Sequence, residues 1–241
     1  MANLLIEIGN TALKAAWSDG MTLGKTFRYQ GEKMFEFIDS LVCKEKPSVM
    51  VISSSIEIGK PEEERLEGIC GKLIVLDKNH TDTAVSNNIP EYITPDRVAS
   101  IIAARYLFNG NGSIVFDFGT TLTVDLIDVD GRYEGGNISP GCRTRFKALN
   151  RYSRSLPLVD TPSNVKETGD SIVSSIESGV IGGIMFEIQG YLSRFPQKTA
   201  VFTGGDALYF AKRMKNSIFV VCNLVLMGLA LIADDYVQKN G

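Results

Sequence analysis

The chain contains an internal repeat whose two copies start about 110 residues apart. The first copy runs Leu4-Leu5-Ile6-Glu7-Ile8-Gly9-Asn10-Thr11, and the second runs Ile114-Val115-Phe116-Asp117-Phe118-Gly119-Thr120-Thr121. Glu7, Gly9 and Thr11 correspond to Asp117, Gly119 and Thr121 at one constant offset of 110 residues (117 minus 7). A repeat of this length is too long to be a solenoid unit. It predicts a duplicated half-molecule.

Each copy has the pattern of a β-hairpin with an acidic residue near its tip. A buried apolar strand ends in a carboxylate, turns through a glycine and returns as a second strand. The small, hydroxyl-rich turn can direct backbone N–H groups and threonine hydroxyls at an anion. A carboxylate beside an anion requires a cation between them, and Mg²⁺ binds through one or two carboxylates together with substrate phosphates. The pair predicts a site for a metal-bound polyphosphate, although an isolated copy is more typical of an ordinary hairpin.

The composition excludes several classes of function. The 241 residues are 44% hydrophobic and 22% charged, which is typical of a soluble globular protein with one large or two small domains. A net charge of −3 gives no basis for a broad electrostatic interaction with nucleic acid or acidic lipid. The N-terminus lacks a secretory-signal pattern, and the apolar stretch 218–233 is shorter than the roughly 20 residues of a membrane span. We expect neither a nucleic-acid nor a membrane partner, and a buried strand followed by a core helix over 218–233.

Cysteine and histidine offer little catalytic or metal-binding chemistry in this chain. The four cysteines share no CxxC spacing, and His80 is the single histidine, so no zinc-binding set is expected. The thiols are expected to be unpaired in a reducing compartment. His80 is interpreted as a solvated residue of a polar loop over 78–90 rather than as a catalyst.

The remaining pattern predicts alternating strands and helices. The expected strands cover 48–53, 72–76 and 200–202, and the expected helices cover 35–43, 61–71, 95–107, 178–195 and 206–215. The segment 135–141 is interpreted as turn-rich. The Asn/Gly cluster 109–112 is predicted to separate an N-terminal half, 1–110, from a C-terminal half, 111–241.

A strand–Gly-Gly–helix junction occurs at Thr203-Gly204-Gly205. Such a junction lets the backbone approach a ligand, and the N-terminus of the following helix favours negative charge. As a third element beside two phosphate-binding hairpins, it predicts an adenosine site. An isolated junction of this kind would be weak evidence.

Taken in order, these motifs resemble those of a known superfamily. The segments 7–11, 117–120 and 203–205 resemble the acetate and sugar kinase/Hsp70/actin superfamily, and within it the chain is similar to type III pantothenate kinases over nearly its full length. The further matching segments are Pro95-Asp96-Arg97, Gly135 to Gly141, Ala148-Leu149, Leu156-Pro157, Glu177-Ser178-Gly179 and Leu224 to Leu229. The resemblance implies an α/β architecture: a duplicated ribonuclease H-like (actin-like ATPase) fold with two halves around a nucleotide cleft.

The same resemblance implies a reaction. It is the ATP-dependent phosphorylation of the primary hydroxyl of pantothenate to 4'-phosphopantothenate, the first step of coenzyme A biosynthesis. Members of this family are cytoplasmic homodimers that need a divalent metal, here Mg²⁺, and a monovalent cation, K⁺ or NH₄⁺.

The resemblance also assigns roles to individual residues. Asp96 matches the catalytic base, Glu7 matches the Mg²⁺-organising residue and Asp117 matches the K⁺ ligand. The matched ATP-binding residues are Glu7, Ile8, Gly9, Asn10, Thr11, Ala12, Leu13, Lys14, Thr120, Gly204 and Gly205, and the matched substrate-binding residues are Tyr92, Thr94, Pro95, Asp96, Arg97 and Ile172. Phosphoryl transfer depends on positioning and on a carboxylate that deprotonates the attacking hydroxyl. An arginine can bind the pantothenate carboxylate through two hydrogen bonds. Without the resemblance, an aspartate that stabilises the first helical turn is the simpler interpretation of Asp96.

Three positions depart from the family pattern. Glu7 replaces the usual aspartate, Thr94-Pro95 replaces Gly-Ala, and Ile172 replaces a threonine, with Ser171 beside it as a candidate source of the hydroxyl. Since all three lie at the expected active site, two alternatives stay open. One is a non-catalytic regulatory relative that binds nucleotide, and the other is a kinase or phosphatase of the superfamily with another substrate.

Overall fold

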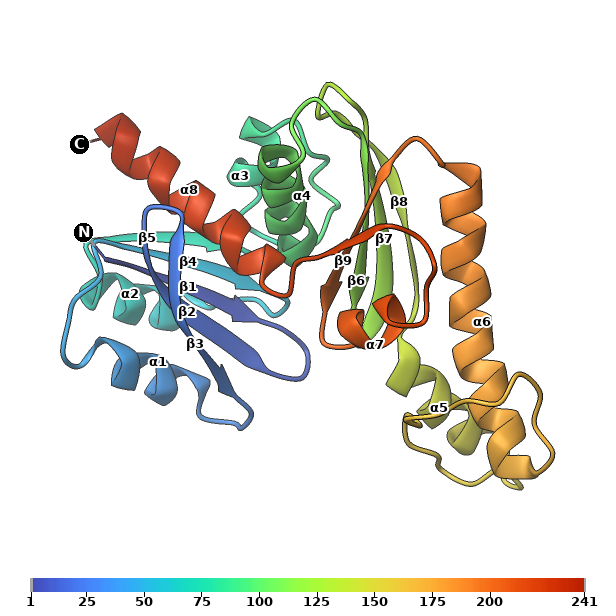
Figure 1. The fold of residues 1–241 in the computed structure, drawn as a ribbon. Coiled ribbons are helices and arrows are strands. Elements are labelled where there is room, and N and C mark those ends of the chain that lie inside the picture. Colours follow the sequence, from blue (N-terminus) through green and yellow to red (C-terminus); the bar gives the residue numbers. More distant parts are fainter. Residues whose placement is uncertain (1, 241) are drawn as a thin grey trace. The chain divides into compact units, whose positions relative to one another are not determined.

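The computed structural model describes residues 2–240 and divides into two compact units (Figure 1). The first unit contains the described residues up to Leu107 together with those from Asn223 onward, and the second contains Phe108–Cys222. The predicted halves, 1–110 and 111–241, follow the order of the sequence. The structure differs from them in grouping the C-terminal residues with the first unit.

The first unit is built on a five-stranded sheet of order β3-β2-β1-β4-β5. β1 pairs antiparallel with β2 and parallel with β4. The strands are β1 (Asn3–Ile8), β2 (Leu13–Asp19), β3 (Thr22–Tyr29), β4 (Val49–Ser54) and β5 (Lys72–Leu76), and the helices are α1 (Met34–Val42), α2 (Lys60–Gly68), α3 (Asp82–Ser86), α4 (Pro95–Leu107) and α8 (Leu224–Asn240).

Alternate residues of β1 are buried on opposite faces of this sheet, as the two-residue period of a strand requires. Leu4 and Ile6 belong to a core that includes residues of α1 and α2, whereas Leu5 is fully buried on the other face. Figure 1 shows α1 and α2 on one side of the sheet and α8 on the other. A Cβ atom on Gly228 of α8 would lie 1.9 Å from the backbone oxygen of Ala99 in α4. This close helix crossing explains why α8 packs with the first unit.

The second unit is built on a five-stranded sheet of order β10-β9-β6-β7-β8. Its core is aromatic: Phe118 stacks on Phe210 with ring centroids 5.1 Å apart, and Phe116 meets Phe202 edge-on at 5.2 Å. The strands are β6 (Ser113–Phe118), β7 (Thr121–Ile127), β8 (Tyr133–Pro140), β9 (Thr199–Gly204) and β10 (Ile218–Val220), and the helices are α5 (Cys142–Tyr152), α6 (Ile172–Arg194) and α7 (Ala207–Ala211).

The two sheets have one topology. Read from the edge that holds the antiparallel strands, the orders are β3-β2-β1-β4-β5 and β8-β7-β6-β9-β10. The central strand of each sheet, β1 or β6, pairs antiparallel with the strand that follows it in the chain, β2 or β7. On its other side it pairs parallel with β4 or β9. The predicted duplication of an α/β half is therefore confirmed in the strand order.

Four local predictions were wrong. The segment 135–141 lies mostly in β8, an exposed edge strand whose polar, glycine-containing sequence resembles a turn. The predicted loop 78–90 contains the short helix α3. Helix α6 begins at Ile172 rather than 178, because Ser171 and Ser174 form a capping box, and α7 ends at Ala211 rather than 215.

The predicted strand and helix over 218–233 are observed as β10 and α8. None of the helices within residues 2–240 is both long enough and apolar enough to cross a membrane.

Candidate active site

The first repeat copy folds as the hairpin β1–β2, as predicted. Glu7 lies opposite Lys14 in the antiparallel register and beside Ser53 in the parallel register. The N–H of Gly9 donates to the Ala12 carbonyl at 3.0 Å and closes the turn. The remaining members of the predicted ATP-binding set in this unit occupy the same strand ends and turn: Ile8, Asn10, Thr11 and Leu13.

Glu7 forms an ion pair within this hairpin and has a raised pKa. Its side chain is 17% exposed, and Lys14 Nζ donates to Glu7 Oε2 at 3.2 Å. Burial raises the pKa of Glu7, the charge and hydrogen bond of Lys14 oppose that rise, and the negative charge of Asp96 adds to it. Glu7 and Asp96 are therefore close enough to interact electrostatically.

Asp96 is placed by the start of α4. Pro95 is the first residue of this helix, where a missing N–H does no harm, and the N–H of Val98 donates to the Thr94 carbonyl at 2.9 Å. Asp96 is half-buried in the first turn, while Arg97 is only 5% exposed. Tyr92 and Thr94, also in the predicted substrate set, are exposed before the helix. The first unit thus brings Glu7, Lys14 and Asp96 into one electrostatic group.

The second repeat copy folds as the hairpin β6–β7. Asp117 lies opposite Thr123 and beside Thr203 of β9. Gly204 has a φ of +89°, and a Cβ atom there would lie 2.4 Å from Asp117 Oδ1. The second unit therefore brings the predicted nucleotide junction, Gly204-Gly205, directly against the predicted cation ligand.

The turn of this second hairpin is braced by the start of α5. The Thr120 carbonyl accepts a hydrogen bond from the Gly141 N–H at 3.0 Å and another from Thr144 Oγ1 at 2.6 Å. A Cβ atom on Gly141 would lie 2.1 Å from the Gly119 oxygen, so this approach requires glycine. Thr144 was not predicted as a site residue. Its signal was its place three residues after Gly141, the last residue of the segment 135–141 that was interpreted as turn-rich.

A second carboxyl group, besides Asp117, adjoins this turn and was not predicted as a site residue. Asp206 directly follows Gly204-Gly205, and its N–H donates to the Phe118 carbonyl at 3.3 Å. Burial raises the pKa of the Asp206 carboxyl. The sequence interpretation treated Asp206 only as the start of a helix.

The oxygen donors in both units suit hard cations. Within residues 2–240, no three His, Cys, Asp or Glu side chains gather as a metal-ligand set. A Mg²⁺ ion here would depend on one or two carboxylates and on phosphate oxygens, as is usual for this ion. Glu7 with Asp96 provides that chemistry in the first unit, and Asp117 provides a carboxylate oxygen in the second.

Ile172 lies at the start of α6 in the second unit. It is 60% exposed and lines an apolar cavity of about 950 Å³ between α5 and α6, together with Tyr152 and Ile176. The hydroxyl of Ser171, the alternative candidate, accepts the Ser174 N–H at 3.2 Å in the capping box. This hydrogen bond shows that Ser171 acts as the N-cap of α6.

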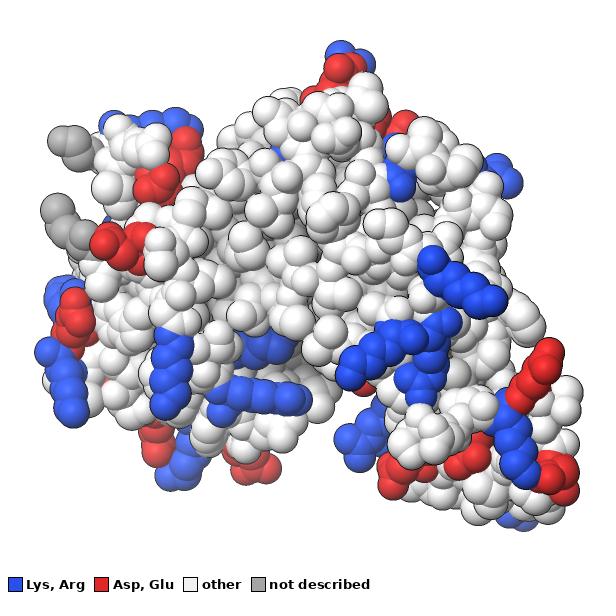
Figure 2. Space-filling model, viewed as in Figure 1, with Lys and Arg blue, Asp and Glu red and all other residues white. Residues whose placement is uncertain are grey.

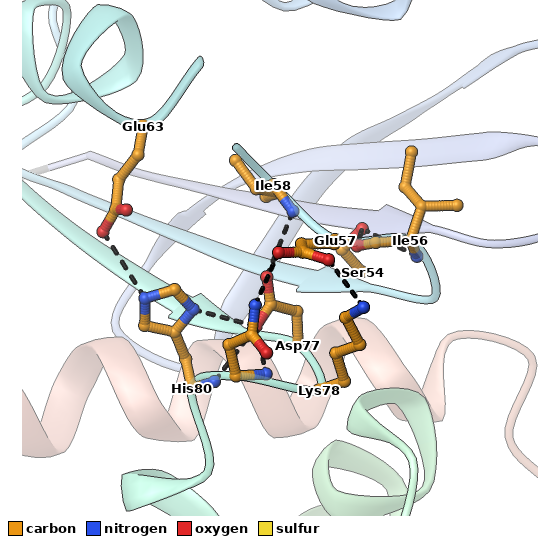
Figure 3. Close-up of polar contacts among 9 residues, drawn as sticks. Ser54, Ile56, Glu57, Ile58, Glu63, Asp77, Lys78 and His80 are labelled. Carbon is orange, nitrogen blue, oxygen red and sulfur yellow. Dashed lines mark hydrogen bonds and ion pairs between the residues drawn. The ribbon is translucent and has the colours of Figure 1, made fainter. Parts of the chain in front are cut away.

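His80 belongs to a separate polar cluster at the carboxyl ends of β4 and β5 (Figure 3). Its Nδ1 lies 2.8 Å from Asp77 Oδ1, and its Nε2 lies 3.6 Å from Glu63 Oε1. Burial raises the pKa of Asp77, but hydrogen bonds from the N–H of Ile58, from His80 and from the N–H of Asn79 outweigh burial and lower it overall. As interpreted from the sequence, His80 lies in a loop and is partly exposed, and its ring contacts Asp77 in the same loop and Glu63 of α2.

The cysteines behave as predicted within the described residues. All four are free thiols; Cys43 and Cys222 are exposed, and Cys70 and Cys142 are buried. Burial raises the pKa of both buried thiols, which favours the unreactive protonated form.

Comparison with known sequences identifies close relatives. A family model described as type III pantothenate kinase matches residues 3–194. A protein of Phocaeicola vulgatus named type III pantothenate kinase is 36% identical over 233 residues, which cover 94% of this chain and 96% of that protein.

Comparison with solved structures identifies the fold. The ROK hexokinase of Thermus thermophilus superposes with a TM-score of 0.56 and 13% identity, covering 100% of both chains. MreB5 of Spiroplasma citri bound to ADP superposes with a TM-score of 0.54 and 11% identity, covering 100% of this chain and 99% of that chain. The strand orders described above therefore belong to the actin-like ATPase fold.

Proposed function

This chain belongs to the type III pantothenate kinase family, and we propose that it transfers the γ-phosphoryl group of ATP to the primary hydroxyl of pantothenate, with Asp96 as the base. The product is 4'-phosphopantothenate, made in the first step of coenzyme A biosynthesis. The observation that supports the residue assignment is that Asp96, half-buried in the first turn of α4, is near enough for its negative charge to raise the pKa of Glu7.

Asp96 takes the proton of the attacking hydroxyl. As the hydroxyl oxygen forms its bond to the γ-phosphorus, the bond from that phosphorus to the β–γ bridging oxygen breaks, and ADP leaves with the electron pair. The half-buried position of Asp96 in the first turn of α4 holds the carboxylate fixed for this step. Positioning and charge stabilisation account for most of the catalysis in such transfers.

Glu7 and Lys14 organise the polyphosphate in the first unit. A Mg²⁺ ion, when bound with ATP, neutralises charge on the phosphate oxygens. Glu7 supplies a carboxylate toward it, and Lys14, 31% exposed, has donors left for a phosphate oxygen besides its contact with Glu7. The backbone turn 9–12 provides the further N–H groups and hydroxyls of the proposed ATP-binding set.

Thr120 and the Gly204-Gly205 junction form the ATP-binding set of the second unit in this proposal. Asp117 would hold the monovalent cation, K⁺ or NH₄⁺. The tight approach of Gly204 to the Asp117 carboxylate, where a Cβ atom would lie 2.4 Å from Oδ1, supports this proposal by placing the carboxylate beside the glycine junction.

Arg97 and Tyr92 are proposed to recognise pantothenate. The buried Arg97 guanidinium suits a carboxylate, and pantothenate carries one. We further propose that the protein acts in the cytoplasm as a homodimer. The exposed apolar side chains of Ile172 and Tyr152 beside the α5–α6 cavity support self-association through this face.

The variant Asp96→Asn tests the role of the base. Loss of a positioned general base lowers kcat by about 10² to 10⁴-fold. The rate would be measured as pantothenate-dependent ADP release with ATP, Mg²⁺ and K⁺. Asp82→Asn is the matched control, because Asp82 also lies in the first turn of a helix in the same unit and is exposed. Full activity of Asp96→Asn would remove Asp96 from its role.

Three further outcomes concern the function as a whole. ATP binding by the wild type without any turnover would indicate the regulatory alternative. Hydrolysis that does not require pantothenate would indicate a different substrate. Equal turnover when Na⁺ replaces K⁺ would contradict the proposed cation site at Asp117.

A further inference from the structure

One segment of the second unit is far more basic than the chain as a whole. Residues 142–154 contain five basic side chains and no acidic one, although the full chain has a net charge of −3. Arg145 is paired with Glu187 on α6. The other four basic residues of the segment are Arg143, Lys147, Arg151 and Arg154, and all are exposed.

Three of these residues form a stripe along α5. Arg143, Lys147 and Arg151 are spaced four residues apart, so they lie on one face of the helix. The adjacent face carries Ala148 and Tyr152, which line the apolar cavity. Figure 2 shows blue side chains gathered over the α5–α7 part of this unit.

No carboxylate within residues 2–240 lies at ion-pair distance from any of the three. The guanidinium of Arg151 lies 6.0 Å from the Tyr152 ring, which does not neutralise its charge. The three positive charges of the basic stripe are therefore not neutralised by ion pairs with the described residues.

The stripe begins at the turn that contains Thr120. Thr144, the neighbour of Arg143, donates its hydroxyl to the Thr120 carbonyl at 2.6 Å. Since side chains on a helix lean toward its N-terminus, the charges of the stripe are directed toward that turn. With a rise of about 1.5 Å per residue, Lys147 lies about 6 Å and Arg151 about 12 Å farther along the helix than Arg143.

We infer that the basic stripe Arg143-Lys147-Arg151 steers ATP to the Thr120 turn and raises its association rate without contacting it in the bound state. The inference rests on the proposed function, in which that turn contacts phosphate. Oriented charge of one sign raises the association rate of an oppositely charged ligand by about 10 to 10³-fold, most strongly at low salt. The Debye length is about 8 Å at physiological salt. Arg143 therefore contributes most and Arg151 least.

The test is the association rate of a fluorescent ATP analogue, measured by stopped flow with Mg²⁺ at one fixed K⁺ concentration. Ionic strength is varied with tetramethylammonium chloride, so that the K⁺ supply does not change. The triple variant Arg143→Gln, Lys147→Gln, Arg151→Gln should associate about tenfold more slowly at low ionic strength, with the wild-type kcat. Its rate should approach that of the wild type at high ionic strength. Among the single variants, the loss should fall in the order Arg143, Lys147, Arg151.

Arg132→Gln is the matched control. Arg132 is 79% exposed in the same unit, in the β7–β8 connection at the far end of β7 from the Thr120 turn. It should leave the association rate unchanged. An unchanged rate in the triple variant would overturn the inference, and so would an equal loss at every ionic strength, which indicates direct contact. If the wild type binds the analogue but does not phosphorylate pantothenate, the proposed function fails while the steering result still stands.

Discussion

The hairpins β1–β2 and β6–β7 share one backbone plan but surround their carboxylates differently. In each, the acidic residue is the last but one of the first strand, and a glycine N–H closes the turn. Glu7 faces Lys14 across the first hairpin, whereas Asp117 faces Thr123 across the second. One carboxylate therefore has a cationic neighbour within the hairpin, and the other has a hydroxyl-bearing residue.

The strands beside the hairpins differ as well. Ser54 of β4 lies next to Ile8, and at the same place in the second sheet Gly204 of β9 lies next to Phe118. At the glycine position, a Cβ atom would lie 2.4 Å from Asp117 Oδ1, whereas Ser54 has a Cβ atom. The two copies have thus kept the same strand arrangement but differ in the residues around the carboxylate. This difference is consistent with the proposed Mg²⁺-organising role of Glu7 and the proposed K⁺-binding role of Asp117.

The largest effect is expected from Gly204→Ala. The new Cβ atom would lie 2.4 Å from Asp117 Oδ1 at a φ of +89°. Backbone strain alone costs about 1–3 kcal/mol for a non-glycine residue in such a conformation, and displacement of Asp117 should add a loss of activity. Urea unfolding and the coupled kinase assay measure the two effects.

Ser54→Ala is the counterpart in the first sheet. Ser54 already has a Cβ atom, and its Oγ donates to the Ile56 carbonyl at 2.7 Å. Loss of this hydrogen bond should cost about 1 kcal/mol with little change in kcat. If Gly204→Ala loses no more stability and activity than Ser54→Ala, the strand beside Asp117 is no more tightly packed against its carboxylate than the strand beside Glu7.

An intermediate effect is expected from the charge of Glu7. Because burial raises the pKa of Glu7 above its ordinary value of 4.5 despite Lys14, the folded state binds the proton more tightly than the unfolded state. This contribution to stability is complete below about pH 4.5 and is lost as the pH rises through the folded-state pKa. Glu7→Gln should remove this dependence of the free energy of unfolding on pH. Urea unfolding of the variant and the wild type at a series of pH values above about 4.5 should therefore give a difference in free energy that changes with pH.

Lys14→Met sharpens the same comparison. Without Lys14, the influence that lowers the pKa of Glu7 is gone, so the window of falling stability should extend to higher pH than in the wild type. Urea unfolding at a series of pH values measures it. If the pH range over which stability falls is the same in Lys14→Met as in the wild type, Lys14 does not lower the pKa of Glu7.

Sequence patterns predicted the parts of this molecule that depend on local chain properties. The hairpin 4–18 and the helix that begins at Pro95 follow from apolar periodicity, a glycine turn and a proline start, and the structure has both. The pairing of Glu7 with Lys14 also follows from the turn length once the hairpin is assumed.

Contacts between distant segments were not predictable in this way. The packing of Gly228 on Ala99, which joins α8 to the first unit, links residues far apart in the chain and has no local pattern. The bracing of the Thr120 carbonyl by Thr144 depends on where β8 ends, and β8 itself was missed because an exposed edge strand need not be apolar. The roles of the site residues came from the family resemblance rather than from patterns.

The smallest effect is expected from Thr123→Val, opposite Asp117. Thr123 is 6% exposed, and its Oγ1 has no hydrogen-bond partner among the described residues. Valine has nearly the same shape and removes the cost of a buried, unpaired hydroxyl, so it should stabilise the protein by about 1 kcal/mol or less. Thr121→Val in the same strand is the control, because Thr121 is exposed and its hydroxyl is hydrated in both states. A Thr123→Val variant that is less stable than the wild type would show that this hydroxyl is hydrogen-bonded, and Thr123 would then be comparable to Lys14 as a polar neighbour opposite the acidic residue.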